Sequence, residues 1–346
     1  MKKTSIIGIL VVLMLCECGQ ECNFSRHAGV LTGLGDTFPQ IFYDIVIPRY
    51  MSETGNKIVY YETTSGEGNR IFYDKIFDFL VADAFLTDNE LIECEADVLH
   101  IPCSLGAVVL AFNVQGVERL NLNSSVITAI YMGKITNWND SAIAKINPGM
   151  NLPNQPIYPV YRSDGNGASY LLSDFLSQTC HEWKKKTGVR KTLKFDVGFA
   201  VRGNISVATA IKNCTGSIGY ISMDLASLLD LPVAAIQNSS GNFVYASRQS
   251  LQSATQKEFP DDMRIVFTNS KNDDAYPIPC LSWILVYRNQ AYNHHTMNEY
   301  QSLISFLNYI VSPEVQIRAS KLTDSPLPLP LIEKAQTMIQ SVKWEE

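Results

Sequence analysis

The chain has 346 residues, of which 46% are apolar and 18% are charged. This is enough for one large or two ordinary packed domains, and it excludes a largely disordered protein. The formal net charge is −6, and the one basic run, at residues 184–186, is typical of a solvated helix end. The charge pattern therefore gives no support for binding nucleic acid.

The first 22 residues have the pattern of a secretory signal peptide. Lys2 and Lys3 precede an apolar run over residues 6–15. That run is shorter than the ~20 residues that span a bilayer, so a cleaved signal fits better than a membrane anchor. We expect cleavage near Cys18 or Gly19, and no later segment is long and apolar enough to cross a membrane.

Attachment to a membrane through a lipid is disfavoured by the residues around these cysteines. A bacterial lipoprotein needs a small residue before the modified cysteine, whereas Leu15 precedes Cys16 and Glu17 precedes Cys18. We expect an exported protein, periplasmic or extracellular, with membrane association as the open alternative.

Strand-like and helix-like stretches alternate along the chain. Near the amino terminus we expect a strand over residues 28–32, a glycine turn, a helix through Ile41 and Tyr50 that Gly55 ends, and strands over 57–62 and 77–82. The later strands are expected at residues 104–113, 157–161, 217–221 and 282–287, and the later helices at 126–132, 168–176, 300–311 and 331–342.

This alternation predicts an α/β fold of two domains. The two long apolar strands, 104–113 and 282–287, are expected to cross between the domains as hinges. The first domain would then comprise residues 23–104 plus 281–346, and the inserted second domain residues 105–280. Ligands of such sheets bind where strands end and helices begin, so the cleft between the domains is the expected site.

Two glycine-rich segments, 32–39 and 162–169, supply candidate ligand groups before helices. In the first, Thr37 and Phe38 offer a hydroxyl and a backbone N–H. In the second, Arg162 adds a fixed positive charge and Asp164 a carboxylate that can hold it, before Asn166, Gly167 and Ser169. Converging N–H groups with one guanidinium suit a small tetrahedral oxyanion.

Ser65 and Asp83 follow two further strands and complete the candidate set. A carboxylate repels an anion unless the anion carries a proton to donate, as hydrogen phosphate does near neutral pH and sulfate does not. Each feature has an ordinary structural alternative: a plain turn, a helix cap or a structural Arg–Asp pair. It is their occurrence together and in order that favours an anion site.

Signatures of other activities are absent from the sequence. Gly33 and Gly35 lack the third glycine of a dinucleotide-binding fingerprint, and there is no P-loop and no GxSxG motif. The histidines are scattered and expected at the surface; they are His27, His100, His181, His294 and His295. We therefore expect no metal, no cofactor and no enzymatic activity.

The cysteines and glycosylation motifs suggest that the chain is secreted through an oxidising compartment. After signal cleavage six cysteines remain, and we expect disulfides, with Cys94–Cys103 first and Cys180–Cys214 second; free buried thiols are the alternative. Six Asn-x-Ser/Thr motifs indicate possible glycosylation, at Asn23, Asn123, Asn139, Asn204, Asn213 and Asn238.

Short motifs spread from about residue 29 to residue 342 resemble the PstS-type periplasmic phosphate-binding proteins of ABC phosphate uptake systems. Besides the two glycine-rich segments, they lie at residues 53–57, 79–83, 130–135 with Trp138, 182–184, 216–220 and 275–278. The resemblance implies a type II periplasmic-binding-protein fold that holds one inorganic phosphate between two domains. It also implies a monomer that works with an ABC permease.

The resemblance further implies a role for each candidate residue. Thr37 and Phe38 match the donors of the first loop, and Ser65 matches the hydroxyl of the second. Asp83 matches the acceptor of the phosphate proton. The second domain would contribute the charged pair and an N–H loop; these residues are Arg162, Asp164, Asn166, Gly167 and Ala168.

Three residues depart from the family pattern. Ala168 replaces a hydroxyl residue, Glu67 adds a charge to the second loop, and Asp36 stands where a small or neutral residue is usual. Because a carboxylate facing the ligand would weaken binding, we expect Asp36 to point away. Two alternatives stay open: an extracellular scavenger or sensor without a transporter, and a phosphatase on the same architecture.

Overall fold

The computed structural model describes residues 30–63, 65–293, 295–320 and 325–345. The predicted signal peptide, Cys22, Asn23, His27 and His294 lie outside this part of the chain. Among the described residues, no helix has the length and apolar character needed to cross a membrane.

An eight-stranded sheet runs through the whole molecule in the order β2-β1-β3-β11-β4-β8-β6-β7. In its first half, β1 (Val30–Asp36) lies parallel to β2 (Lys57–Thr63) and β3 (Phe79–Ala82). In its second half, β6 (Tyr158–Arg162) lies parallel to β7 (Phe199–Val201) and β8 (Ser217–Ser222). A small second sheet contains β5 (Asn121–Leu122), β9 (Ala235–Gln237) and β10 (Phe243–Val244).

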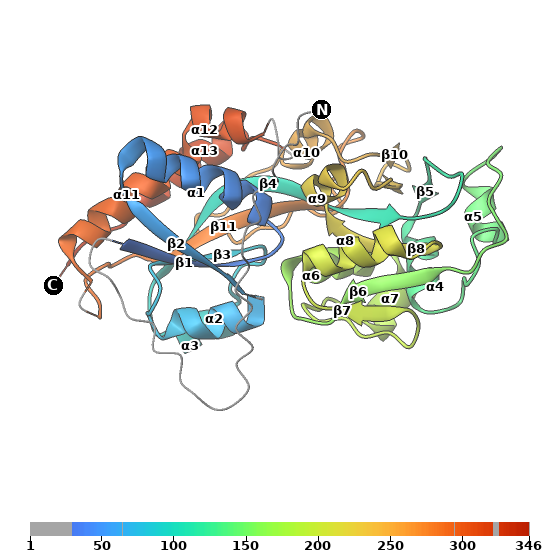
Figure 1. Ribbon diagram of the computed structural model, residues 1–346, viewed down its shortest axis with the longest axis horizontal. Coiled ribbons are helices and arrows are strands. Elements are labelled where there is room, and N and C mark those ends of the chain that lie inside the picture. Colours follow the sequence, from blue (N-terminus) through green and yellow to red (C-terminus); the bar gives the residue numbers. More distant parts are fainter. Residues whose placement is uncertain (1–29, 64, 294, 321–324, 346) are drawn as a thin grey trace, which may run out of the picture.

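Two antiparallel strands join the halves, as the sequence predicts. β4 (Val98–Phe112) pairs with β11 (Pro279–Tyr287) as far as Ala107, and with β8 from Val108 onward. Figure 1 shows the two lobes that result, with β4 passing from one to the other. The boundaries at 104/105 and 280/281 stay predictions, and the change of sheet in β4 lies close to the first of them.

Helices cover both faces of the first half of the sheet (Figure 1). α1 (Gln40–Thr54), α11 (Met297–Val311), α12 (Pro313–Ala319) and α13 (Leu329–Gln340) lie on one face, and α2 (Ser65–Tyr73) and α3 (Asp88–Cys94) on the other. The chain between β4 and β11 forms α4 (Ser124–Tyr131), α5 (Ser141–Lys145), α6 (Gly167–Thr179), α7 (His181–Lys186), α8 (Asn204–Asn213), α9 (Met223–Leu228) and α10 (Arg248–Ala254).

The predicted glycine turn after residue 32 is wrong, because β1 continues to Asp36. A β-carbon at Gly33 would lie 2.2 Å from the ring of Phe79, and one at Gly35 would lie 1.6 Å from the hydroxyl oxygen of Tyr60. These glycines therefore make room for aromatic side chains of the neighbouring strands. The ligand-facing turn starts only after Asp36.

Both predicted disulfides are wrong. Cys94, Cys103, Cys180 and Cys214 are all free thiols in the described chain. The Cys94 sulfur lies 3.7 Å from the hydroxyl of Tyr287, whereas Cys103 donates to the carbonyl oxygen of Ser282 at 3.2 Å. Each sulfur is thus packed into its own environment. Nearness in sequence was misleading, because α3 ends at Cys94 while Cys103 lies within β4.

Two of the predicted glycosylation motifs are closed off by the fold. The side-chain nitrogen of Asn204 is buried and donates to Ser222, and that of Asn238 is buried and donates to the carbonyl oxygens of Asp273 and Ala275. Asn139 and Asn213 are exposed.

Candidate functional site

The candidate residues meet where strands of both halves end. Asp36 is the last residue of β1, Asp83 directly follows β3, and Arg162 is the last residue of β6. Gly167 begins α6. The carboxyl ends of parallel strands and the amino end of a helix therefore face one another across the junction, which is the usual ligand position in such sheets.

Arg162 is 1% exposed and is held by two carboxylates. Its Nε donates to Asp164 Oδ1 at 2.8 Å, and its Nη2 donates to Asp164 Oδ2 and, at 3.3 Å, to Asp36 Oδ1. Burial opposes the positive charge, but Asp164 and Asp36 raise the pKa of Arg162 above its ordinary value. Its Nη1 is buried and has no hydrogen-bond partner among the described residues.

Asp83 is completely buried, and one of its carboxylate oxygens has no hydrogen-bond partner in the described chain. Its Oδ1 accepts a hydrogen bond from the hydroxyl of Ser282, while its Oδ2 has no partner in the described chain. Burial and the nearby carboxylate of Asp36 raise the pKa of Asp83 well above its usual range. The junction thus holds one unpaired donor and one unpaired acceptor, each costly to bury without a partner.

Gly167 and Asn166 form the amino end of α6 beside this pair. A β-carbon at Gly167 would lie 2.4 Å from the Asp83 β-carbon and 2.6 Å from its carbonyl oxygen. Asn166 caps the helix, since its side chain accepts from Ser169 N at 2.8 Å. Ala168 is 2% exposed. The close approach brings the first backbone groups of α6 directly against Asp83.

The first loop supplies a contact between the two halves. The hydroxyl of Thr37 accepts from Asn204 N at 3.1 Å and donates to Asp36 Oδ1 at 3.2 Å. Phe38 is buried at the start of α1. Ser65 is the first residue of α2, and its side chain lies outside the described part of the structure.

Asp36 does not point away from the site, so that prediction is wrong. It is 1% exposed and forms an ion pair with Arg162, which lies in the other half of the molecule. The register of β1 explains this orientation. As the last residue of a parallel strand, Asp36 lies at the edge where the site is built, within reach of the Arg162 guanidinium.

Several supporting residues were not singled out from the sequence. Tyr220 accepts from Arg162 N at 3.1 Å and shares a hydrogen bond with Ser169 Oγ at 2.7 Å. Asn204 and Ser282 bind Thr37 and Asp83 as described above. Tyr220 belongs to a segment that carries the family resemblance, but its partner lies 58 residues away in the chain.

Two ion pairs join the halves beside the site. Arg202 Nη2 lies 2.8 Å from Glu67 Oε2, and Lys191 Nζ lies 2.7 Å from Glu90 Oε1. The first pair is exposed and the second is about one quarter exposed. A hollow of about 480 Å³ opens next to them; its lining includes Thr37, Glu62, Thr63, Arg202, Gly203, Ile205 and Ser206.

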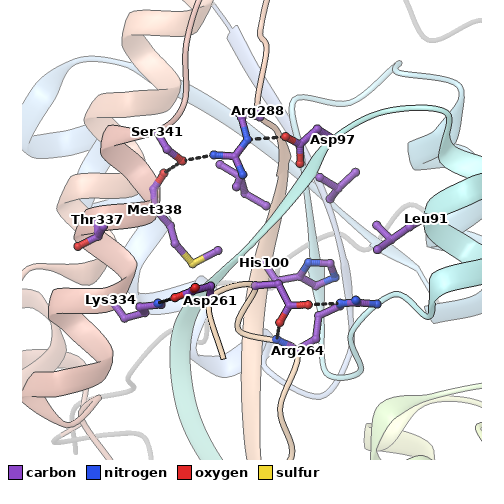
Figure 2. A pocket seen from close by; sticks show the side chains of 13 residues that line it. Leu91, Asp97, His100, Asp261, Arg264, Arg288, Lys334, Thr337, Met338 and Ser341 are labelled. Carbon is purple, nitrogen blue, oxygen red and sulfur yellow. Dashed lines mark hydrogen bonds and ion pairs between the residues drawn. The ribbon is translucent and has the colours of Figure 1, made fainter. Parts of the chain in front are cut away.

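A separate hollow of about 370 Å³ lies between α13, β4 and residues 261–264 (Figure 2). Its cations are already paired: Arg288 with Asp97, Lys334 with Asp261, and Arg264 with Asp262.

His100 on β4 is buried, as is His295, so the prediction of surface histidines is wrong for both. Within the described ranges, no group of three or more His, Cys, Asp or Glu residues is arranged to hold a metal ion.

The protein belongs to the class of two-lobed α/β proteins in which both lobes share one sheet and a buried charged site lies at their junction. A family model described as PBP superfamily domain matches residues 24–314. A phosphate-binding protein PstS from Pasteurella multocida is 32% identical over 317 residues, covering 90% of both chains. One from Xylella fastidiosa (strain Temecula1) is 33% identical over 261 residues, covering 74% of this chain and 71% of the relative.

Solved structures share the fold. The phosphate-bound periplasmic phosphate-binding protein PfluDING aligns with a TM-score of 0.72 at 19% identity, covering 89% of this chain and 93% of its own. The phosphate-binding protein of Stenotrophomonas maltophilia aligns with a TM-score of 0.68 at 20% identity, covering 90% and 94%. The chain belongs to the PBP superfamily and, within it, to the PstS-type phosphate-binding proteins.

Proposed function

We propose that this protein captures inorganic phosphate between its two lobes and hands it to an ABC-type permease. The relatives above are named for phosphate binding, and the PfluDING structure contains phosphate. The observation that carries the proposal is the pair of unpartnered buried atoms, Arg162 Nη1 and Asp83 Oδ2. A protonated phosphate accepts from the first through an oxygen and donates to the second through its hydroxyl.

Each candidate residue has a role in this proposal. Arg162 supplies the charge, and Asp164 orients its guanidinium. Thr37, Phe38 and Ser65 donate from the first lobe, and Asp83 accepts the phosphate proton. Asn166, Gly167 and Ala168 bring the backbone N–H groups of the α6 amino terminus, where the helix dipole favours an anion.

We also propose that the protein is exported and does not catalyse a reaction. The signal-like first 22 residues support export, and the named relatives are binding proteins. Turnover of a chromogenic phosphate ester above the blank, lost in an Arg162→Ala variant, would contradict the second part of this proposal.

Calorimetric titration of the phosphate-stripped mature protein tests the main proposal. We expect one phosphate bound per chain at pH 6 to 8 and no heat from sulfate, which has no proton for Asp83. Arg162→Ala should lose roughly a hundredfold in affinity, because it removes the cation and leaves buried carboxylates unpaired. The matched control is Arg119→Ala, an exposed arginine that should bind like the wild type. Absence of phosphate binding by the wild type throughout this pH range would contradict the proposal.

A further inference from the structure

Ser282 occupies one of the two oxygens of the Asp83 carboxylate. It lies on β11, whose antiparallel register pairs Trp283 with Ala82 on β3. Continuing that register by one residue brings Ser282 opposite Asp83, where its buried hydroxyl donates to Oδ1. Oδ2 of the same carboxylate has no partner in the described chain. The serine therefore leaves Oδ2 as the oxygen that can meet a ligand.

An irregularity in the pairing of β11 with β4 holds the backbone of Ser282 in place. Ser282 pairs with Ser104. The next residue, Trp283, already pairs with Pro102, so β4 contains one extra residue, Cys103. The thiol of Cys103 donates to the carbonyl oxygen of Ser282 at 3.2 Å. Because a bulge of this kind re-aims side chains, the strand pairing itself directs the Ser282 hydroxyl at the site.

The hydrogen bond from Ser282 affects the protonation state of Asp83. Burial, followed by the Asp36 carboxylate, raises the pKa of Asp83. The hydroxyl of Ser282 and the positive charge of Arg162 act in the opposite direction, because both favour the ionised form. An ionised Asp83 offers a lone pair at Oδ2, whereas a protonated one would offer a hydrogen there. Ser282 thus helps to determine whether this atom accepts or donates.

Other ionisable groups act on Asp83 from the elements packed around it. Arg162 at the end of β6 is the cation. The acids and weak acids are Asp36 on β1, Tyr43 on α1, Tyr60 on β2, Cys103 on β4 and Asp224 on α9. Burial raises the pKa of each phenol and of the thiol, so these three groups stay uncharged. Asp36 and Asp224 both oppose the ionisation of Asp83, and Ser282 is an uncharged group that favours it.

We propose that Ser282 sets the selectivity of this site for an anion that carries a proton, by keeping Asp83 Oδ2 an acceptor. The inference rests on the proposed function and adds a positioning residue to it, since Ser282 acts on the ligand through Asp83. A ligand oxygen without a proton meets a lone pair at Oδ2, which is costly in a buried place. Hydrogen phosphate avoids this cost by donating its own proton, and sulfate cannot.

Removal of the hydroxyl should convert this acceptor into a donor. In Ser282→Ala, Asp83 Oδ1 loses its hydrogen bond and the carboxyl is protonated more easily. A protonated Asp83 can donate to a sulfate oxygen, so the sulfate affinity of this variant should rise as the pH falls from 8 to 6. Hydrogen bonds to charged groups are among the stronger ones, so the phosphate-to-sulfate affinity ratio at pH 6 should fall at least about tenfold from the wild-type value.

The experiment is titration calorimetry of phosphate with and without competing sulfate, at pH 6, 7 and 8. It compares the wild type with Ser282→Ala and with a matched pair, Ser282→Thr and Ser282→Val. Threonine keeps the hydroxyl and valine has nearly the same shape without it, so the pair separates the hydrogen bond from packing. Ser282→Thr should keep the wild-type ratio, and Ser282→Val should follow Ser282→Ala.

Ser217→Ala is the control for the loss of a buried serine. The hydroxyl of Ser217 donates to the carbonyl oxygens of Ile211 and Cys214, at the end of β8 that lies away from Arg162. This variant loses buried hydrogen bonds without altering the surroundings of Asp83. It should therefore keep the wild-type phosphate-to-sulfate ratio at every pH.

Proton counting gives a readout that a loss of packing would not move. Titrations at pH 7 in buffers of different ionisation heat measure the protons taken up with each anion. Sulfate binding to Ser282→Ala should take up as much as one proton per anion, because the complex holds Asp83 in its protonated form. Phosphate brings the shared proton itself, so its binding to the same variant should take up fewer.

The possible outcomes separate this inference from the proposed function. If Ser282→Ala and Ser282→Val bind phosphate with the wild-type ratio at every pH, Ser282 does not set the selectivity, while the proposed function stands. A ratio that falls equally in Ser282→Thr and Ser282→Val would assign the effect to packing and overturn the inference. Absence of phosphate binding by the wild type at every pH would overturn both proposals. Thermal melting without ligand identifies the folded variants, and the threonine and valine pair decides if Ser282→Ala does not fold.

Discussion

Gly167 at the start of α6 lies directly against Asp83, so that a β-carbon at position 167 would be 2.4 Å from that of Asp83. These residues come from opposite lobes and are 84 positions apart. Their contact allows backbone N–H groups of one lobe and a carboxylate of the other to reach the same small ligand.

Gly167→Ala should prevent this approach and lower phosphate affinity at least about tenfold, because overlap with Asp83 cannot be relieved without moving backbone. Titration calorimetry measures the loss. Gly66→Ala is the control, since a β-carbon there has no atom within 4 Å. Wild-type affinity in Gly167→Ala would show that the lobes need not meet this closely to hold phosphate.

Asp83→Asn should narrow the difference in affinity between phosphate and sulfate. The asparagine amide can donate to an oxygen that carries no proton, whereas the wild-type carboxylate requires a proton from the ligand. Competition between the two anions, measured at pH 8, checks this expectation. If the phosphate-to-sulfate ratio does not change, Asp83 does not select the protonated ligand.

Lys191→Ala and Arg202→Ala should each speed the release of phosphate. Their ion pairs with Glu90 and Glu67 join the lobes only while these are together. Exposed ion pairs contribute about 0.2–1 kcal/mol, so each substitution should raise the Kd for phosphate by up to about fivefold. The larger of the two increases is expected for Lys191, which is the less exposed residue.

Stopped-flow displacement of phosphate measures the release rate, and added salt should shrink the difference from wild type. Lys186→Ala is the control, because its partner Glu182 lies on the same helix. If all three variants release phosphate at one rate, the pairs between the lobes do not stabilise the closed form.

His100 should make the protein sensitive to acid. Burial, followed by the positive charge of Arg264, lowers the pKa of His100 from 6.5 to about 4, and its Nε2 accepts from Leu86 N at 3.1 Å. Between these pH values the unfolded chain binds a proton that the folded protein does not. The contribution of His100 to the free energy of unfolding is therefore fully present above about pH 6.5 and is lost as the pH falls toward about 4.

Melting curves from pH 7.5 to 4 check this expectation. His100→Gln keeps an acceptor for Leu86 but cannot be protonated, so its melting temperature should fall less steeply with acid than that of the wild type. Parallel curves would assign the acid sensitivity to carboxyl groups elsewhere.

Local patterns were sufficient for the regular elements around the site. The helical spacing that starts at Ile41 and the stop at Gly55 match α1, which ends at Thr54 with Gly55 in the left-handed conformation. The strand expected at 57–62 is β2 with one residue added. In these segments the residues that determine the structure are neighbours in sequence, so period and turn chemistry carry the information.

The failures share a physical cause, which is dependence on distant partners. The orientation of Asp36 depends on Arg162, 126 residues later. Gly33 and Gly35 are explained by the rings of Phe79 and Tyr60 on other strands, and a turn was the wrong interpretation. β4 begins at Val98, six residues before the predicted start, because pairing with β11 extends it through Pro102. A single sequence shows none of these pairings.

The position of β11 has a consequence for how the chain folds. This strand lies between β3 and β4, yet it comes nearly 200 residues after β3 in the sequence. Until residues 279–287 have been synthesised, β3 and β4 lack a shared neighbour and the first lobe has an unfilled gap in its sheet. Contacts of such long sequence separation form slowly. The nascent chain therefore stays incompletely folded until almost its whole length has been made, which is the state in which a polypeptide can still be threaded through a membrane.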